Sequence, residues 1–171
     1  MPPVLSVVIV NWNVRDLLAR SLESIRSSWP DPESIEAIVV DNASQDGSAD
    51  MVRSVFPGVH LIASEQNRGF TGGNNLGISA ATGDYIMLLN PDTEVIADAL
   101  VTMVTYLQEH PDVALVGPKL LDPDGSPQSS RRRFPSLSIL FLESTWLQSL
   151  LPTRRLQQYY VNDVEDSGIQ D

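Results

Sequence analysis

The sequence contains no cysteine among its 171 residues, which excludes disulfide bonds, thiolate metal sites and cysteine nucleophiles together. Histidine is also scarce, because only His60 and His110 can supply an imidazole. Basic residues are few: 11 Lys and Arg stand against 22 Asp and Glu, which gives a net charge of -11. A nucleic-acid backbone is therefore not an expected partner, and an anionic small molecule would need a metal ion as a bridge.

Two phosphate-binding motifs are missing as well. The chain has neither a Gly-x-x-x-x-Gly-Lys-Ser/Thr loop nor a Gly-x-Gly-x-x-Gly after its first apolar run, which argues against an NTPase and a dehydrogenase. No basic region precedes that run, so we predict no signal peptide and a cytoplasmic protein. The 42% hydrophobic and 19% charged residues are typical of a globular domain. We predict one domain over residues 1–135 and an appendage, helical and then acidic, over residues 136–171.

Short apolar runs alternate with amphipathic stretches along the chain. This alternation predicts an α/β fold, with a Rossmann-like, mostly parallel sheet and flanking helices. Asn13 is expected to cap the first helix, and Asp46 or Ser48 the second. The predicted strands span residues 5–10, 35–40, 59–63, 85–89 and 113–116, and the predicted helices begin near residues 13, 48, 76 and 97.

The apolar run Tyr85 to Leu89 organises the chain, because it stops on a cluster of oxygen ligands. A continuous run of this length predicts a strand that is buried on both faces of the sheet. Asn90 and Asp92 follow it, separated by a proline, and their oxygens can bind one hard cation such as Mg²⁺ or Mn²⁺. The alternative is an ordinary turn followed by a helix cap.

Polar groups follow other predicted strands in the same way. Asn11 and Asn13 follow the first strand, and Asp41 ends the second. Because parallel strands end at one edge of a sheet, we expect these side chains and Asp92 to line a single crevice. The glycine-rich stretch that includes Arg68, Gly69, Gly73 and Asn74 should be a loop before a helix, and its backbone N–H groups suit phosphate or ribose oxygens.

The sequence changes character after Gln128. Arg131, Arg132 and Arg133 form its basic cluster, which is either a solvated loop or a clamp for a diphosphate. Residues 137–151 are leucine-rich but too short to span a bilayer. They fit a helix that packs against the domain or against a missing segment, and the alternative is peripheral contact with a membrane surface.

Four motifs occur in order in the first part of the chain: Val7–Asn13, Val39–Ser48, Asn67–Gly77 and Leu89–Thr93. Together they resemble the family 2 glycosyltransferases, specifically the bacterial rhamnosyltransferase-like branch, from about residue 5 to residue 135. The resemblance implies a GT-A fold, here incomplete at the C-terminus, together with polysaccharide biosynthesis. It also implies a UDP-, dTDP- or GDP-linked sugar donor, a divalent metal (Mg or Mn), a glycan or lipid-linked acceptor and inversion at the anomeric carbon.

The same resemblance implies roles for individual residues. Asp41 resembles the residue that reads the nucleobase, and Asp92 the second, metal-binding acid of an Asp-x-Asp motif. Asn90 stands where the first acid would be, which removes one anionic ligand. We expect the donor to contact Asn11, Asn13, Asp41, Arg68, Gly69, Gly73, Asn74 and Asn90, with Asp92 on the metal.

The general base of the reaction is not identified in the sequence. In the family it belongs to a Glu-Asp pair after a further strand, whereas Glu165-Asp166 here lacks the apolar surroundings that would position it. We therefore expect an inverting hexosyltransferase or its donor-binding portion, located in the cytoplasm or at the inner face of the cell membrane. The alternatives are a non-catalytic module that binds nucleotide sugars and a sugar nucleotidyltransferase. The latter is disfavoured because Asn11-Trp12-Asn13 is not a glycine-rich basic loop.

Overall fold

The structure is a computed structural model that describes residues 3–128, 136 and 139. The chain divides into two compact units, residues 1–116 and residues 117–171. The first unit holds all the helices and strands named below, whereas the described part of the second contains a tight turn closed by a bridge between Leu121 and Pro127. The predicted domain boundary at residue 135 lies at the end of a stretch outside the described residues and stays a prediction.

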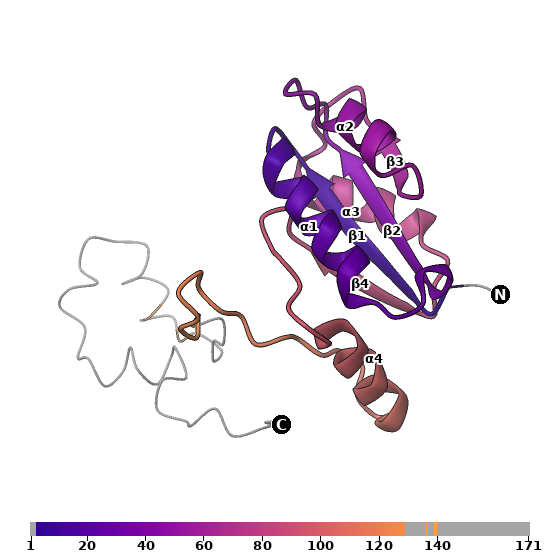
Figure 1. Ribbon diagram of the computed structural model, residues 1–171, viewed down its shortest axis with the longest axis vertical. Helices are drawn as coiled ribbons and strands as arrows, with labels where there is room; N and C mark the ends of the chain where they lie inside the picture. Colours follow the sequence, from indigo (N-terminus) through magenta and orange to yellow (C-terminus); the bar gives the residue numbers. More distant parts are fainter. Residues whose placement is uncertain (1–2, 129–135, 137–138, 140–171) are drawn as a thin grey trace. The chain divides into compact units, whose positions relative to one another are not determined.

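The first unit is built on a four-stranded parallel sheet in the order β3-β2-β1-β4 (Figure 1). In the register, Asn11 of β1 lies beside Asp41 of β2, and Ile9 beside Leu89 of β4. The α/β fold predicted from the alternation of apolar runs is therefore confirmed. The strands are β1 (Leu5–Asn11), β2 (Ile35–Asp41), β3 (His60–Ala63) and β4 (Tyr85–Leu89); the helices are α1 (Arg15–Ser28), η1 (Pro32–Ser34), α2 (Ser48–Val55), α3 (Gly69–Ala80) and α4 (Ala99–Glu109).

One face of the sheet carries the main hydrophobic core. Val7 and Ile9 of β1 and Val39 of β2 point to this face and are fully buried. The helices α1, α2 and α4 supply the other side of the core through Leu18, Leu22, Ile25, Met51, Val52, Leu100 and Val104. On β1 and β2, the residues that alternate with Val7, Ile9 and Val39 point to the opposite face, because side chains alternate along a strand.

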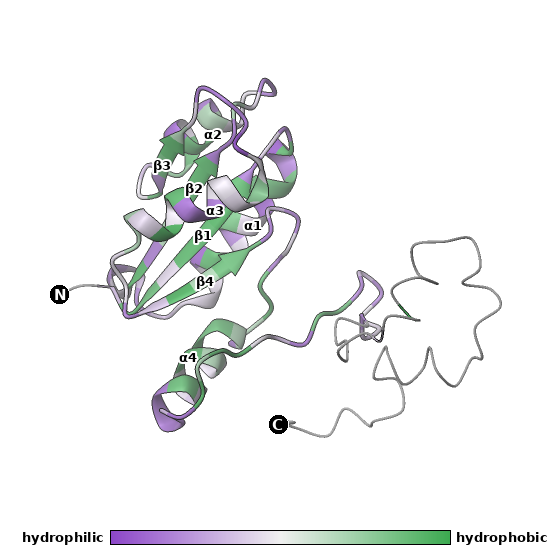
Figure 2. Ribbon diagram, turned by 180° about the vertical axis from the view of Figure 1, so that it is seen from behind, coloured by the Kyte–Doolittle hydropathy of each residue, from purple (hydrophilic) through white to green (hydrophobic). Residues whose placement is uncertain are grey.

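Helix α3 covers the opposite face and packs very closely against it, as Figure 2 shows from behind. A Cβ atom added at Gly73 would lie 2.6 Å from Cγ1 of Val10, and one at Gly77 would overlap Cγ1 of Val8. Both positions of α3 therefore require a residue without a side chain. This packing explains why a glycine-rich segment, poor in intrinsic helix propensity, is helical here.

Replacing Gly77 by alanine is expected to lower the free energy of unfolding by about 1 to 2 kcal/mol. Alanine would gain about 1 kcal/mol in helix propensity, but overpacking against the buried Val8 should cost about 2 to 3 kcal/mol, the upper part of the usual range, because the added Cβ atom would overlap Cγ1 of Val8. The matched control is Gly58→Ala, because a Cβ atom at Gly58 would meet no atom within 4 Å. Urea denaturation followed by circular dichroism measures both variants. Equal stability of the Gly77 variant and the parent would contradict the packing described here.

Three sequence-based expectations about local structure are wrong. Helix α3 begins at Gly69 and not near residue 76, so most of the glycine-rich stretch is helix rather than loop. Strand β4 is not buried on both faces, since Ile86 and Leu88 are 46% and 50% exposed. Residues 113–116 do not form a strand, and Leu115 is 86% exposed.

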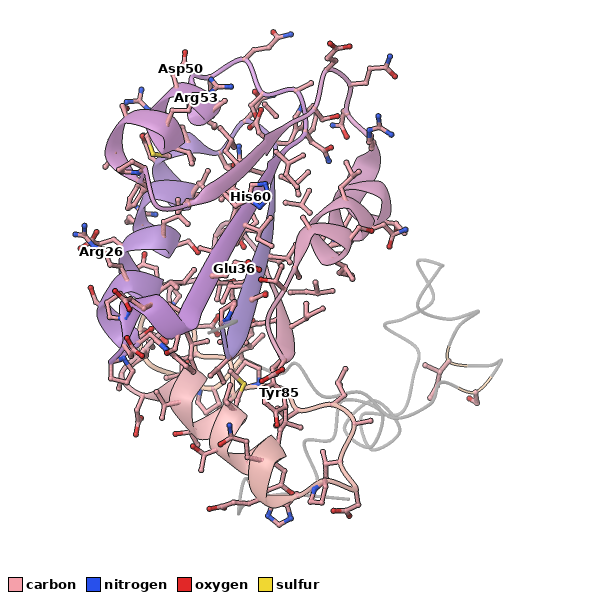
Figure 3. All side chains as sticks on the ribbon, turned by 90° about the vertical axis from the view of Figure 1, so that its right-hand side faces the viewer. Arg26, Glu36, Asp50, Arg53, His60 and Tyr85 are labelled. Atoms are coloured by element: carbon pink, nitrogen blue, oxygen red, sulfur yellow. The ribbon has the colours of Figure 1, made fainter. Side chains whose placement is uncertain are left out.

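The amino-terminal edge of the sheet is held by Glu36 of β2. Its carboxylate accepts hydrogen bonds from Ser6 Oγ (2.6 Å) and from the backbone N–H and hydroxyl of Thr82, and Ser6 Oγ also accepts one from Gly83 N (2.8 Å). Partial burial raises the pKa of Glu36, but these hydrogen bonds, with the nearby His60 on β3, outweigh burial and lower it (Figure 3). The ionised carboxylate thus ties three segments together, at the end of the sheet opposite the predicted site.

Among the described residues, no helix is both long and apolar enough to cross a lipid bilayer.

Candidate functional site

The predicted site residues gather at the carboxyl-terminal edge of the sheet. Asn11 and Asp41 are the last residues of β1 and β2, and Asp92 follows β4 by three residues. All three strands run in the same direction, with β1 in the middle, so Asp41 and Asp92 flank the end of β1. The ends of β2 and β4 are two strand spacings apart, which amounts to about 10 Å.

A buried hydrogen-bond network links the ends of β1 and β2. The Nδ2 group of Asn11 donates to Asp41 Oδ1 (2.8 Å) and to Ser44 Oγ (3.1 Å), and Asp41 Oδ2 accepts from the backbone N–H of Ser44 (3.0 Å). Asn11 is fully buried and Asp41 is only 3% exposed. Within the part of the chain that the structure describes, Asn11 Oδ1 is a buried acceptor without a hydrogen-bond partner. Burying an acceptor in this way is costly unless something donates to it.

The loop after β2 folds back onto the segment that leads into α1. Asn13 does not cap α1 as expected: its Oδ1 accepts from the backbone N–H of Gln45 (2.7 Å), and its own backbone N–H donates to Ser44 Oγ (2.9 Å). Asn13 and Ala43 have positive φ values of 55° and 61°. Left-handed backbone at a residue such as alanine is unfavourable in isolation, so these contacts hold the loop in one conformation.

Asp46 ties the first turns of α1 and α2 together. One oxygen accepts from Arg15 N (2.8 Å), and the other accepts from the backbone and the hydroxyl of Ser48, at the start of α2. The prediction that Asp46 or Ser48 caps the second helix is wrong, because Gly47 is the capping residue, although the Asp46 carboxylate does accept hydrogen bonds at this helix start. Slight burial raises the pKa of Asp46, but the hydrogen bonds from Ser48 and Arg15 outweigh burial and lower it, so the carboxylate is ionised at neutral pH.

A second buried amide joins the end of β2 to the start of α3. Asn42, which is 2% exposed, donates from Nδ2 to Gly69 O (3.0 Å) and accepts at Oδ1 from Arg68 N (3.3 Å). Gly69 has a positive φ of 69°, and Arg68 precedes α3 with no side-chain cap on the helix. Arg68 and the first turn of α3 therefore lie at the same edge as Asp41.

Gly73 and Asn74 lie deeper than the rest of the predicted donor-binding residues. Gly73 is buried against Val10, and Asn74, 6% exposed, donates from Nδ2 to Phe70 O within the helix (3.0 Å). Both residues have structural roles, and their assignment to donor binding stays a prediction.

The segment after β4 forms a turn that exposes its polar side chains. The backbone N–H of Thr93 donates to Asn90 O (3.2 Å), which closes the turn, and both Asn90 and Asp92 are exposed. The alternative interpretation of these residues as a turn is thus correct in geometry, but the N-cap position of α4 is occupied by Asp98, whose side chain makes no capping hydrogen bond. The following residues are fixed to α1, because Val95 N donates to Ser24 Oγ (2.8 Å) and Glu94 pairs with Arg20 (3.1 Å).

The donor set at this turn fits a metal ion that is shared with a ligand. Over residues 3–128, with 136 and 139, no three His, Cys, Asp or Glu side chains gather to hold a metal on their own. Mg²⁺ and similar ions are commonly held by one or two carboxylates together with substrate phosphates and water. The single exposed carboxylate of Asp92, beside the amide of Asn90, is compatible with that arrangement.

Sequence reasoning missed two residues of the site, Ser44 and Asn42. Each acts through hydrogen bonds to segments distant in sequence. Both lie within the Val39–Ser48 motif, but the motif does not show which segments they contact. Three predicted features lie outside the described residues: the basic cluster Arg131 to Arg133, the predicted helix within residues 137–151, and the Glu165-Asp166 pair.

Comparison with curated proteins finds relatives that match 60% to 80% of this chain. A Mycobacterium tuberculosis N-acetylglucosaminyl-diphospho-decaprenol L-rhamnosyltransferase is 29% identical over 148 residues, covering 80% of this chain and 48% of the relative. The succinoglycan biosynthesis protein ExoO of Rhizobium meliloti is 35% identical over 103 residues, covering 60% of this chain and 29% of that protein. The chain thus spans less than half the length of these curated relatives.

Solved structures agree on the fold. The mannosyltransferase PcManGT from Pyrobaculum calidifontis, in complex with GDP-Man and Mn²⁺, matches with a TM-score of 0.57 and 26% identity, over 63% of this chain and 33% of that one. Staphylococcus aureus TarS 1-349 in complex with UDP matches with a TM-score of 0.58 at 21% identity, over 64% of this chain and 33% of that one. The parallel sheet with flanking helices is therefore the GT-A fold. The model of glycosyl transferase family 2 matches residues 6–166, and the chain belongs to this family.

Proposed function

We propose that this chain binds a nucleotide-diphosphate sugar at the carboxyl edge of its sheet and serves in the transfer of the sugar to an acceptor hydroxyl. The observation that carries the proposal is the convergence of three separate segments on that edge: the network around Asn11 and Asp41, the start of α3 at Arg68, and the turn at Asp92. A nucleotide sugar offers a base, a ribose and a diphosphate. The first of these segments provides hydrogen-bond acceptors, the second provides backbone N–H groups, and the third provides a metal ligand.

The two ends of the edge would bind different parts of the donor. Asp41 and the buried Oδ1 of Asn11 are acceptors, suited to N–H groups of a base or to a ribose hydroxyl. Arg68 is the cation near the start of α3, where free backbone N–H groups favour phosphate oxygens. Asn13, Gly69 and Asn90 lie along the same edge and complete the proposed donor site, with Gly73 and Asn74 behind them. Asp92 would hold a divalent metal on the diphosphate.

The reaction proposed is a single displacement with inversion. The acceptor oxygen forms a bond to C1 of the sugar as the bond from C1 to the diphosphate oxygen breaks, and the acceptor proton passes to a base. When bound, a divalent metal, Mg²⁺ or Mn²⁺, would neutralise negative charge on the departing diphosphate. The contribution of the edge described here is to align the donor and to bind its leaving group.

The names of two relatives suggest the class of acceptor. The name of the Mycobacterium tuberculosis relative describes a lipid-linked acceptor, and that of the Rhizobium meliloti relative describes polysaccharide biosynthesis. We accordingly propose a glycan or lipid-linked acceptor. A hexose donor and action in the cytoplasm or at the inner face of the cell membrane stay predictions from the sequence.

A second candidate is a module that binds nucleotide sugars without transferring them. It is favoured by one observation: Asp41, at the end of β2, and Asp46, in the loop that follows, both use their oxygens in internal hydrogen bonds, so neither is free to act as the base.

Calorimetry with UDP, dTDP and GDP, each with and without Mn²⁺, tests the proposal. We expect one of the three nucleotides to bind, and to bind more tightly with the metal. Failure of all three to bind would contradict a donor site. Incubating the matching nucleotide sugars with glycan or lipid-linked acceptors and following nucleotide release then separates an enzyme, which releases nucleotide, from a binding module, which does not.

A further inference from the structure

The side chain of Asn42 has no role in the proposed chemistry, yet Asn42 is 2% exposed and both its Oδ1 and its Nδ2 make a hydrogen bond. It immediately follows Asp41, and its backbone N–H donates to Asn11 O (2.8 Å), so β1 and β2 fix its position. Its carboxamide then reaches across to a different segment, 26 and 27 residues further along the chain.

The contacts of this carboxamide bracket one short piece of backbone. Oδ1 accepts from Arg68 N at 3.3 Å, and Nδ2 donates to Gly69 O at 3.0 Å. The same Nδ2 lies 3.2 Å from the place that a Cβ atom would take at Gly73. The amide is therefore held against α3 by packing as well as by hydrogen bonds.

The bracketed backbone has an uncommon conformation. Gly69 has a φ of 69°, and its own N–H is taken by Asn67 Oδ1 at 2.8 Å. Two asparagine side chains thus determine how the chain turns into α3, and with it where Arg68 lies. The side chain of Arg68 makes one long hydrogen bond, from Nε to Ser64 Oγ at 3.4 Å. The backbone of Arg68 is therefore held more firmly than its side chain.

We infer that Asn42 is a positioning residue, which holds Arg68 and the first turn of α3 at a set distance from Asp41. This inference rests on the proposed function, because it concerns the two ends of the same donor site. With Asn42 in place, the base-binding end and the phosphate-binding end are joined by one rigid amide. Without it, each end keeps its own residues but loses its spacing from the other.

The test uses Asn42→Asp, which keeps the size of the side chain and the acceptor for Arg68 N. It replaces the donor to Gly69 O by an oxygen, which repels that carbonyl. We expect affinity for whichever of UDP, dTDP and GDP the parent protein binds to fall about tenfold, as measured by calorimetry. If the aspartate variant does not fold, Asn42→Ala removes both hydrogen bonds without adding charge, and the same loss is expected.

The matched control is Ser6→Ala. Ser6 is fully buried, and its hydroxyl also joins two segments, Glu36 and Gly83, but at the opposite edge of the sheet. We expect the control to lower the melting temperature to a similar extent and to leave nucleotide affinity unchanged. A merely structural role for Asn42 predicts that both variants behave alike.

A double-mutant cycle with Arg68→Ala shows whether Asn42 acts through Arg68. We expect the double variant to bind about as weakly as the weaker single variant, because both changes remove the same interaction. Additive losses, or an Asn42→Asp variant that melts normally and binds within twofold of the parent, would overturn the inference while leaving the proposed function intact. A parent protein that binds none of the three nucleotides would overturn both.

Discussion

Replacing Asp92 by alanine is expected to abolish the metal-dependent part of nucleoside diphosphate binding. Loss of a group that only supports a metal ligand typically costs about 10- to 100-fold in affinity, so loss of the ligand itself should cost at least about 100-fold. The fold should be unaffected, because Asp92 is exposed in the turn after β4. Calorimetry with nucleotide and Mn²⁺, alongside a thermal melt, measures both effects.

Asp98→Ala is the matched control for this prediction. Asp98 is another exposed acid of the same segment, six residues further on, and its side chain does not cap α4. We expect this variant to bind like the parent, since removal of one surface charge has a small effect on a metal ion bound elsewhere. If Asp92→Ala bound nucleotide and Mn²⁺ as tightly as the control, Asp92 would not be part of the metal site.

Replacing Asp41 by asparagine is expected to weaken nucleoside diphosphate binding by about tenfold to a hundredfold and to leave pyrophosphate binding unchanged. Hydrogen bonds to a charged group contribute about 1.5 to 3 kcal/mol, and an acceptor for a base N–H would be lost while the phosphate end stayed intact. The variant should also melt earlier, because Asp41 Oδ2 accepts from Ser44 N, and an amide nitrogen turned to that side would oppose the N–H.

The loss of stability has to be separated from the loss of recognition. Asp46→Asn serves this purpose, because Asp46 accepts backbone hydrogen bonds from Arg15 and Ser48 in the neighbouring turn. We expect it to melt earlier as well, with nucleoside diphosphate affinity close to that of the parent. Equal weakening of nucleoside diphosphate and pyrophosphate by Asp41→Asn would argue against base recognition by Asp41.

The parallel sheet and the edge that carries the candidate site could be predicted from the sequence because both depend on local patterns. β-branched runs such as Val7 to Val10 form buried strands, and alternation with amphipathic helices makes the strands parallel. Parallel strands then bring Asn11, Asp41 and Asp92 to one edge, whatever the details of the loops. The positions of these residues in the fold follow from topology alone.

Two expectations, on the glycine-rich segment and on strand β4, failed because packing in the whole fold decided the outcome and local sequence preference did not. Gly69 to Gly77 would be a poor helix in isolation, and it is helical because only glycine lets α3 lie so close to Val8 and Val10. Conversely, the apolar run of β4 predicts burial on both faces, but the described residues leave Ile86 and Leu88 exposed. The sequence does not show which residues of the folded protein cover a given apolar side chain.

Asn42 and Ser44 could not be found from the sequence, since their importance lies in which distant segments they meet. Both are polar residues in a loop, where asparagine and serine are ordinary turn residues. The bond from Asn42 to Gly69, and that from Asn11 to Ser44, span 27 and 33 residues. Only the folded structure shows that these amide and hydroxyl groups connect segments that are distant in the sequence.

The hydrogen bonds across the carboxyl edge have a kinetic consequence. The backbone N–H groups of Gln45, Ser44 and Arg68 donate to side-chain oxygens of Asn13, Asp41 and Asn42, respectively. Each of these bonds must open before its N–H can exchange with solvent. These three groups should therefore exchange with deuterium more slowly than N–H groups in exposed loops that lack such bonds.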